Sequence, residues 1–256
     1  MKFAIFTKTD KDVSSSVNLL LEQCEKYHFI RDDVNPELVF VFGGDGTFLK
    51  AVHHYLDQLD NIKMVGINCG SLGFFYDFFE KDIPHLFDLL INKSFCEAKH
   101  NLIECQVGDK KIYAVNEIRF EDPFHTMVTQ VNVDDEYLEN FRGNGLLVCN
   151  ELGSTAYNKS LGGAVISSNI SALQLTEIAS IQNNIYRSLG SSYVCHPDTV
   201  FTFSGNFSSV VLGYDFLTMN CGDVDKIVVK TADKKVTIIH DKNHNNLHAL
   251  KRSFIK

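Results

Sequence analysis

The strongest constraint on the fold is an alternation of apolar runs with helix-spaced apolar residues, which continues to about residue 95. Three runs are continuous enough to form buried strands: KFAIFT at 2–7, ELVFVF at 37–42 and IKMVGIN at 62–68. Helical spacing is found at 17–27, 47–59 and 83–93, and the serines at 14–16 are placed to cap the first helix. Strands that alternate with helices in this way predict a parallel α/β sheet.

Beyond residue 95 the pattern changes to short stretches with period-two alternation, separated by turn residues. This pattern predicts an antiparallel, all-β C-terminal domain with one helical insert that starts near residue 154. The expected strands lie at 97–108, 110–122, 126–141, 143–150, 199–205, 208–216, 226–233 and 234–242. The expected limits are 1–95 for an α/β domain, 96–236 for the β domain and 237–256 for a polar tail.

Composition narrows the possible partners. The chain has 24 basic and 32 acidic side chains, a net charge of −8, which argues against binding to nucleic acid or to an anionic membrane surface. Its 7 cysteines are scattered, with no Cys-x-x-Cys pair, as is typical of reduced thiols in a cytoplasmic protein. No signal peptide and no membrane span are expected.

The sequence GGDGT at 43–47 joins the second predicted strand to a helix. A strand, a glycine loop and a helix together direct backbone N–H groups and the positive end of the helix toward an anion. The loop is neither a Walker A sequence nor the dinucleotide fingerprint. Asp45 beside a phosphate would act as a base for an attacking hydroxyl or would hold Mg²⁺. On this motif alone, a simple Asx-type turn that caps the helix is favoured.

Further motifs stand in register with this loop: GINCGSLGFF at 66–75, AVNEIRF at 114–120, NELGSTAYNKSLGGAV at 150–165 and LTEIASIQNNIYRSLGS at 175–191. In order and spacing they resemble the NAD kinase family of bacterial type. The resemblance implies an α/β domain and an all-β domain, with the tail packing back on the first. It implies phosphoryl transfer from ATP, or polyphosphate, to the 2′-hydroxyl of the adenosine ribose of NAD. A divalent cation, usually Mg²⁺, and a homodimer or homotetramer are implied as well.

The resemblance also implies roles for individual residues. Asp45 matches the catalytic base, Gly44 and Gly46 line the phosphates, and Phe74 lies near the adenine. Asn116 and Glu117 match a pair that holds the ribose hydroxyls, which suits an amide and a carboxylate. The remaining positions match the walls around the adenine and ribose: Thr155, Ala156, Tyr157, Asn158, Lys159, Ser160, Ala179 and Ile181.

Some positions depart from the family pattern. Asn144 stands where relatives have an aspartate that contacts the nicotinamide end of the dinucleotide, and Glu151 replaces a proline in a Ser-Thr-Pro-x-Gly segment. Phe216 stands where close relatives often have histidine. Glu151 adds a negative charge near an anionic ligand, which Arg142 would partly offset. A lowered affinity for NAD or an altered substrate preference is therefore expected.

Two alternative functions stay open at this point. Lipid kinases of the diacylglycerol and sphingosine type share the GGDGT loop, but they lack the NE and GSTAY context and act at membranes. A non-catalytic NAD-binding sensor would explain the departures but not the carboxylate at 45. No metal-ligand set is expected, and four histidines are interpreted as surface residues: His53, His54, His244 and His248.

Overall fold

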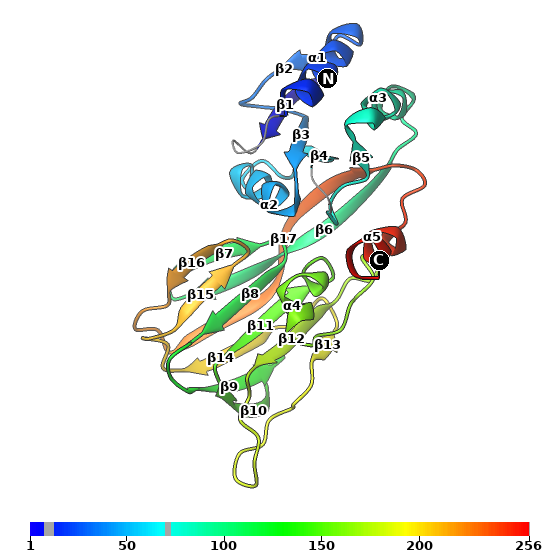
Figure 1. The fold of residues 1–256 in the computed structure, drawn as a ribbon. Helices are drawn as coiled ribbons and strands as arrows, with labels where there is room; N and C mark the ends of the chain where they lie inside the picture. The colour runs from blue at the N-terminus through cyan, green and yellow to red at the C-terminus, as the bar shows by residue number, and fades with distance from the viewer. Residues whose placement is uncertain (8–12, 70–72, 256) are drawn as a thin grey trace. The chain divides into compact units, whose positions relative to one another are not determined.

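The structure is a computed structural model that describes residues 1–7, 13–69 and 73–255 (Figure 1). The chain forms two compact units. Unit 1 contains Met1–His100 and Lys234–Lys256, and unit 2 contains Asn101–Asp233. Each unit is described by itself.

Unit 1 is built on a parallel sheet. Strand β1 (Lys2–Thr7) pairs with β3 (Leu38–Gly43), which pairs with β4 (Lys63–Asn68); the short β2 (Ile30–Arg31) and β5 (Phe78–Phe79) pair with β1 and β4. Every residue of β3 is buried, as its uninterrupted apolar sequence predicts for a central strand covered on both faces. The expected parallel α/β part of the fold is confirmed.

The helices of unit 1 are α1 (Ser14–Lys26), α2 (Asp45–His54), α3 (Ile83–Asn92) and α5 (Asn246–Phe254), with a 3-10 turn at Glu80–Asp82. The predicted serine cap of α1 is wrong. Its N-cap is Val13, which makes no side-chain cap bond, and the Ser16 hydroxyl donates to Glu80 instead. Helix α2 ends at residue 54, five residues before its predicted end. The tail forms α5, which was not predicted.

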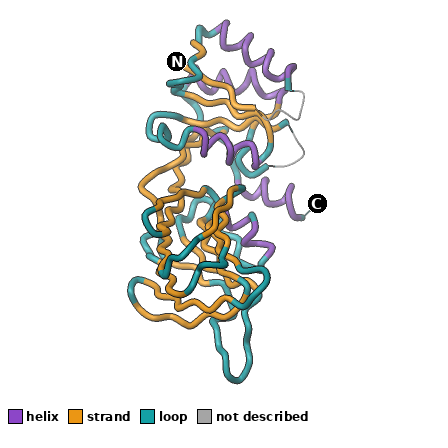
Figure 2. The backbone as a smooth tube through the Cα atoms, turned by 90° about the vertical axis from the view of Figure 1, so that its left-hand side faces the viewer, coloured by secondary structure: helices purple, strands orange, loops and turns teal. Residues whose placement is uncertain are grey.

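Unit 2 consists mainly of strands, and its strands pair with one another in antiparallel fashion (Figure 2). One sheet has the order β13-β12-β11-β8-β15-β16. Its strands are β8 (Glu117–Glu121), β11 (Gly145–Asn150), β12 (Leu173–Ile178), β13 (Tyr193–Cys195), β15 (Val211–Tyr214) and β16 (Leu217–Asn220). Strands β12 and β13 were not predicted.

The second set of strands in unit 2 comprises β7 (Lys110–Ala114), β9 (Met127–Val133), β10 (Glu136–Gly143) and β14 (Phe201–Gly205). It also includes the part of β6 (Cys96–Val107) that follows His100 and the part of β17 (Lys226–His240) that precedes Lys234. The prediction of separate strands at 226–233 and 234–242 is wrong, because β17 runs unbroken through both segments. The predicted strand at 110–122 is likewise two strands, β7 and β8.

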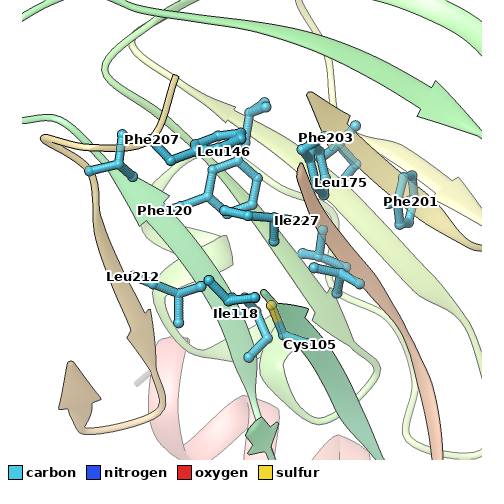
Figure 3. Packing of buried hydrophobic residues seen from close by; sticks show 14 of the residues in the cluster. Cys105, Ile118, Phe120, Leu146, Leu175, Phe201, Phe203, Phe207, Leu212 and Ile227 are labelled. Atoms are coloured by element: carbon cyan, nitrogen blue, oxygen red, sulfur yellow. The ribbon is translucent and has the colours of Figure 1, made fainter. Parts of the chain in front are cut away.

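The core of unit 2 joins side chains of both strand sets (Figure 3). Phe120 of β8 and Phe203 of β14 pack edge to face, with ring centroids 4.5 Å apart. Leu146, Leu175 and Ile227 extend the same cluster from β11, β12 and β17. Such burial of large apolar side chains fixes the strands whose ends carry the predicted binding residues.

Candidate functional site

The GGDGT loop lies where β3 ends at Gly43 and α2 begins at Asp45, with Gly44 as an extended N-cap. The carboxylate of Asp45 bonds another part of the chain. Its Oδ1 accepts the backbone N–H groups of Phe74 at 2.9 Å and Phe75 at 3.3 Å, and its Oδ2 lies 3.1 Å from the Phe74 nitrogen. The interpretation as a simple Asx-type cap is therefore wrong, since α2 has no side-chain cap bond.

Burial raises the pKa of Asp45 above its ordinary value, and the N–H bonds from Phe75 and Phe74 oppose this rise. A carboxylate whose pKa is raised holds a proton more readily and is a stronger general base. Tyr76 supports the loop, because its hydroxyl donates to the carbonyl of Gly44 at 2.8 Å. The loop thus holds one directed carboxylate at the start of a helix.

Gly44 and Gly46 face open space. A Cβ atom built on either residue has no heavy atom within 4 Å among the described residues, and neither has a left-handed φ. Gly73, by contrast, is held by packing, since its Cβ would lie 2.6 Å from the ring of Tyr76 and 3.1 Å from Asp45 Oδ1. Neither packing nor backbone conformation requires glycine at 44 and 46. The arrangement fits close approach by a ligand to the start of α2.

Phe74 is predicted to lie near the adenine, and in the structure its ring contacts another aromatic ring. Its ring is half-buried and lies 5.7 Å from the ring of Phe254, in α5. Of the motif GINCGSLGFF, the residues 70–72 lie outside the described residues. The adenine contact of Phe74 stays a prediction.

In unit 2, Asn116 and Glu117 lie at the break between β7 and β8. Asp215 fixes this break: its Oδ2 accepts the N–H of Val115 at 2.8 Å, and its Oδ1 accepts the N–H of Asn116 at 2.7 Å. Asp215 has a φ of +51° and is buried. Sequence reasoning missed this residue; the only signal was a lone carboxylate within an apolar strand-like stretch.

Glu117 is buried, and its Oε1 lies 3.5 Å from Arg119 Nη1. Its Oε2 has no hydrogen-bond partner among the described residues. Burial raises the pKa of Glu117 to about 8, the charge of Asp215 adds to the rise, and Arg119 opposes it. A buried polar oxygen without a partner is costly, so this oxygen suits a ligand hydroxyl as its hydrogen-bond partner.

The segment after β11 packs directly on this pair. It comprises a 3-10 turn at Gly153–Thr155 and the short helix α4 (Tyr157–Ser160). A Cβ on Gly153 would lie 1.8 Å from the carbonyl oxygen of Asn116, so only glycine permits this contact. The Tyr157 hydroxyl donates to Glu121 at 3.2 Å, and the Arg119 guanidinium lies 5.5 Å from the Tyr157 ring centroid.

The neighbours of Tyr157 differ in exposure. Thr155 and Ala156 are half-buried, and Lys159 and Ser160 are exposed. These residues are open to a ligand, and their predicted contacts stay predictions.

Asn158 is an internal residue. Its amide donates to the carbonyls of Ser154 at 3.3 Å and Ala164 at 3.2 Å. Its carbonyl accepts the Thr176 hydroxyl at 2.7 Å, and its exposed fraction is 0%. A side chain with no exposure cannot contact a substrate without moving. In this structure Asn158 therefore holds α4 in place, and the predicted contact with the substrate is not available to it.

Arg142, Asn144, Ala179 and Ile181 come together at the end of β10. The Ile181 N–H donates to the Arg142 carbonyl at 2.7 Å, and the Asn144 N–H donates to the Ile178 carbonyl at 3.0 Å. Ala179 has a left-handed φ of +49°, which is uncommon for a residue with a Cβ and marks a constrained turn. The predicted wall residues therefore form one cluster.

Two side chains of this cluster have partners of their own. The Arg142 guanidinium lies 4.3 Å from the ring centroid of Tyr186, a residue that sequence reasoning missed. Asn144 Nδ2 donates to the Asp122 carbonyl at 3.0 Å, which an ionised aspartate could not do. The departure at 144 thus has a structural reason within this chain.

The other departures lie differently. Glu151 is 6% exposed, so its carboxyl group lies in the interior and not on the surface. Phe216 is 43% exposed, immediately after Asp215. The structure gives no reason for phenylalanine at that position.

The four histidines expected at the surface divide into two groups. His54 and His248 are exposed, and His53 is half-buried. For His244 the interpretation is wrong: its side chain is 18% exposed, and its Nδ1 lies 2.8 Å from both carboxylate oxygens of Asp77.

Comparisons with known proteins identify the family of this chain. The family model for the ATP-NAD kinase N-terminal domain matches residues 7–95, and that for the ATP-NAD kinase C-terminal domain matches 116–184. NAD kinase of Lactobacillus helveticus is 35% identical over 261 residues, covering 100% of this chain and 97% of the relative. NAD kinase of Lactococcus lactis subsp. cremoris is 38% identical over 218 residues, covering 82% and 81%.

Two solved structures share the fold. An NAD kinase from Archaeoglobus fulgidus in complex with ATP has a TM-score of 0.82 at 18% identity, covering 98% of this chain and 99% of the other. Yeast NADH kinase complexed with NADH has a TM-score of 0.82 at 18% identity, covering 100% and 87%. The expected two-part fold is confirmed, and with both family models and full-length relatives matching, the chain belongs to the NAD kinase family.

Proposed function

We propose that this chain transfers the γ-phosphoryl group of ATP to the 2′-hydroxyl of the adenosine ribose of NAD, giving NADP and ADP. The observation that carries the proposal is the Asp45 carboxylate, held by two backbone N–H groups beside glycines that face open space. The membership of the NAD kinase family supports the same reaction. The lipid kinase and the sensor have no such support.

In this proposal Asp45 is the general base. The 2′-oxygen forms a bond to the γ-phosphorus, the bond from that phosphorus to the bridging oxygen of ADP breaks, and the hydroxyl proton passes to the carboxylate. The N–H groups of Phe74 and Phe75 orient the carboxylate, and burial raises its pKa toward the range in which a base is effective. Proton transfer of this kind contributes roughly 10²–10⁴-fold to a rate.

Gly44 and Gly46 would admit the phosphates to the start of α2, where the helix dipole favours negative charge. The loop also fits a divalent cation, because Mg²⁺ is commonly held by one or two carboxylates together with substrate phosphates. Asp45 would supply the carboxylate oxygen if it acts as a cation ligand instead of as the base. When bound, the cation neutralises charge on the phosphates.

The ribose and the bases would be held by unit 2. The amide of Asn116 and the unpartnered Oε2 of Glu117 match the donor and acceptor needs of a ribose diol. The proposed walls around the adenine and ribose in unit 2 are Thr155, Ala156, Tyr157, Lys159 and Ser160. Phe74 is proposed, by itself, to contact the adenine. The proposed nicotinamide side is Arg142, Asn144, Ala179 and Ile181.

We also propose a homodimer or homotetramer that acts in the cytoplasm and accepts polyphosphate as a second donor. Light scattering of the purified protein measures its mass and tests the first point. In the described ranges no helix combines the length and apolar character that a bilayer-spanning helix needs.

The test is an assay of the purified full chain with NAD, ATP and Mg²⁺, in which NADP is measured by an NADP-specific cycling reaction. Parallel arms replace ATP with polyphosphate and NAD with diacylglycerol or sphingosine. The expected result is NADP formation that the Asp45→Asn variant slows by about 10²–10⁴-fold. Phosphorylated lipid without NADP, or no product at saturating NAD, would refute the proposal.

A further inference from the structure

Three side chains outside the GGDGT loop form a compact cluster in unit 1. Asp77 lies just before β5, His240 is the last residue of β17, and His244 lies in the turn before α5. His240 Nδ1 is 2.9 Å from Asp77 Oδ2, and His244 Nδ1 is 2.8 Å from both oxygens of the same carboxylate. The imidazole ring centroids are 3.9 Å apart, and the candidate ligand atoms lie within 4.8 Å of one another.

We propose that Asp77, His240 and His244 bind a transition-metal ion of the Zn²⁺ class. Two imidazole nitrogens and one carboxylate oxygen form a donor set that Zn²⁺ accepts, and three protein ligands leave a coordination position for water. Magnesium is a poor match, because it prefers oxygen ligands in near-octahedral geometry. This site is therefore distinct from the site of the cation that accompanies ATP.

The surroundings suit a bound cation. The side chains of His240, Asp77 and His244 are only 7%, 14% and 18% exposed, so their orientations are fixed by packing. The Asp241 N–H donates to Asp77 Oδ2 at 3.2 Å, which holds the carboxylate plane. Metal ligands are typically oriented by such outer hydrogen bonds.

A cavity of about 240 Å³ opens beside the cluster and gives a metal and its water a path of entry. Its lining is richer in carboxylates than in fixed cations, with Asp77, Asp82 and Asp241 against one arginine, Arg252. Asp241 is paired with His85 at 2.7 Å. Negative potential in a confined space raises the local concentration of cations. His85 and His248 line the same cavity.

A metal at this position would act on the segment that holds Asp45. Asp77 lies two residues beyond Phe75, whose N–H, with that of Phe74, bonds the Asp45 carboxylate. The ring of Phe74 also contacts Phe254 of α5. By joining the end of β17 and the turn before α5 to Asp77, the ion would restrain residues 73–79. Its role is structural rather than catalytic.

The experiment uses the full chain after removal of metals with a chelator. Zn²⁺ affinity is measured by competition with a chromophoric chelator, and Co²⁺ is added separately to record its ligand-field absorption. The variants are His244→Ala and the milder His244→Gln. Residue 244 lies in a turn, and glutamine keeps a polar side chain there. His196→Ala is the matched control, because His196 is an exposed histidine 3.5 Å from Asp198. Cys96→Ser controls for an exposed thiol.

The wild type is expected to bind one Zn²⁺ at this site, at least about 100-fold more tightly than either His244 variant, since the loss of an outer-sphere partner alone costs 10–100-fold. A hundredfold excess of Zn²⁺ over its Kd should raise Tm by roughly 5–10 °C in the wild type and both controls. Hydrogen exchange in the peptide containing 73–79 should slow with Zn²⁺ in the same proteins.

Equal Zn²⁺ affinity in the wild type and both His244 variants would overturn the proposal. So would an unchanged exchange rate at 73–79 when the ion is bound. Neither readout depends on phosphoryl transfer, so an inactive protein that binds Zn²⁺ through His244 would still support the site. If the proposal fails, Asp77 serves as a hydrogen-bond partner of the two histidines and of the Asp241 N–H.

Discussion

Replacing Glu117 with glutamine should remove a pH-dependent loss of stability. In the folded chain burial raises the pKa of Glu117 to about 8, against an ordinary value of 4.5. The folded state therefore keeps the proton over a range in which the unfolded chain releases it. The free energy of unfolding contributed by Glu117 is fully present below pH 4.5 and is lost progressively as the pH rises toward 8.

The size of the effect follows from the pKa difference. Between the two pKa values the folded chain binds about one more proton at this residue, so the free energy of unfolding falls by about 1.4 kcal/mol per pH unit. From pH 5 to pH 7.5 the loss amounts to about 3 kcal/mol. Glutamine keeps the shape and cannot ionise, so the Glu117→Gln variant should gain about that much relative to the wild type over this interval.

The assay is urea unfolding at a series of pH values, followed by far-UV circular dichroism because the chain has no tryptophan. The matched control is Asp122→Asn. A hydrogen bond from Ser209 lowers the pKa of Asp122 to about 2, so its stabilising contribution is lost only as the pH falls below about 4. Its offset from the wild type should be constant from pH 5 to 7.5. A similarly constant offset for Glu117→Gln would refute the reasoning.

Three further substitutions test the site. Asp45→Asn should lower kcat by about 10²–10⁴-fold and leave NAD binding by calorimetry nearly unchanged; a near-normal kcat would exclude the general base. Gly153→Ala should cost about 1–3 kcal/mol or more, because the new Cβ would lie 1.8 Å from the Asn116 carbonyl oxygen, and an unchanged Tm would contradict that contact. Asn144→Asp should cost about 1 kcal/mol in urea unfolding, since the bond to the Asp122 carbonyl is lost; equal stability would show that this bond contributes nothing.

The parallel part of the fold could be predicted because its strands are continuous apolar runs, and β3 is buried at every position. The break between β7 and β8 at Val115 and Asn116 could not be predicted. Local alternation continues through it, and the carboxylate that interrupts the strand belongs to Asp215, 100 and 99 positions further along the chain. The opposite error occurred in β17, where Thr231 and Asp233 resemble a turn but lie in extended backbone within a 15-residue strand.

The histidine cluster shows a similar limit. In the sequence the i, i+4 pair is His244 and His248, and no carboxylate or cysteine there completes a ligand set. The pair that meets in the structure is His240 and His244, and its carboxylate comes from Asp77, 163 residues before His240. Spacing along the chain can suggest two ligands on one segment. A third ligand from another segment depends on the folded topology.

The glycines separate residues needed for folding from residues needed for a ligand. In the sequence Gly44, Gly46, Gly73 and Gly153 all lie in motifs of one family and look equivalent. In the structure a Cβ would collide at Gly73 and Gly153, so these two are explained by the chain's own atoms. At Gly44 and Gly46 a Cβ would have no described atom within 4 Å, and the backbone there is not in a left-handed conformation. Alanine at those two positions should therefore leave Tm unchanged and weaken ATP binding, and equal ATP affinity would remove the argument that phosphates approach this loop.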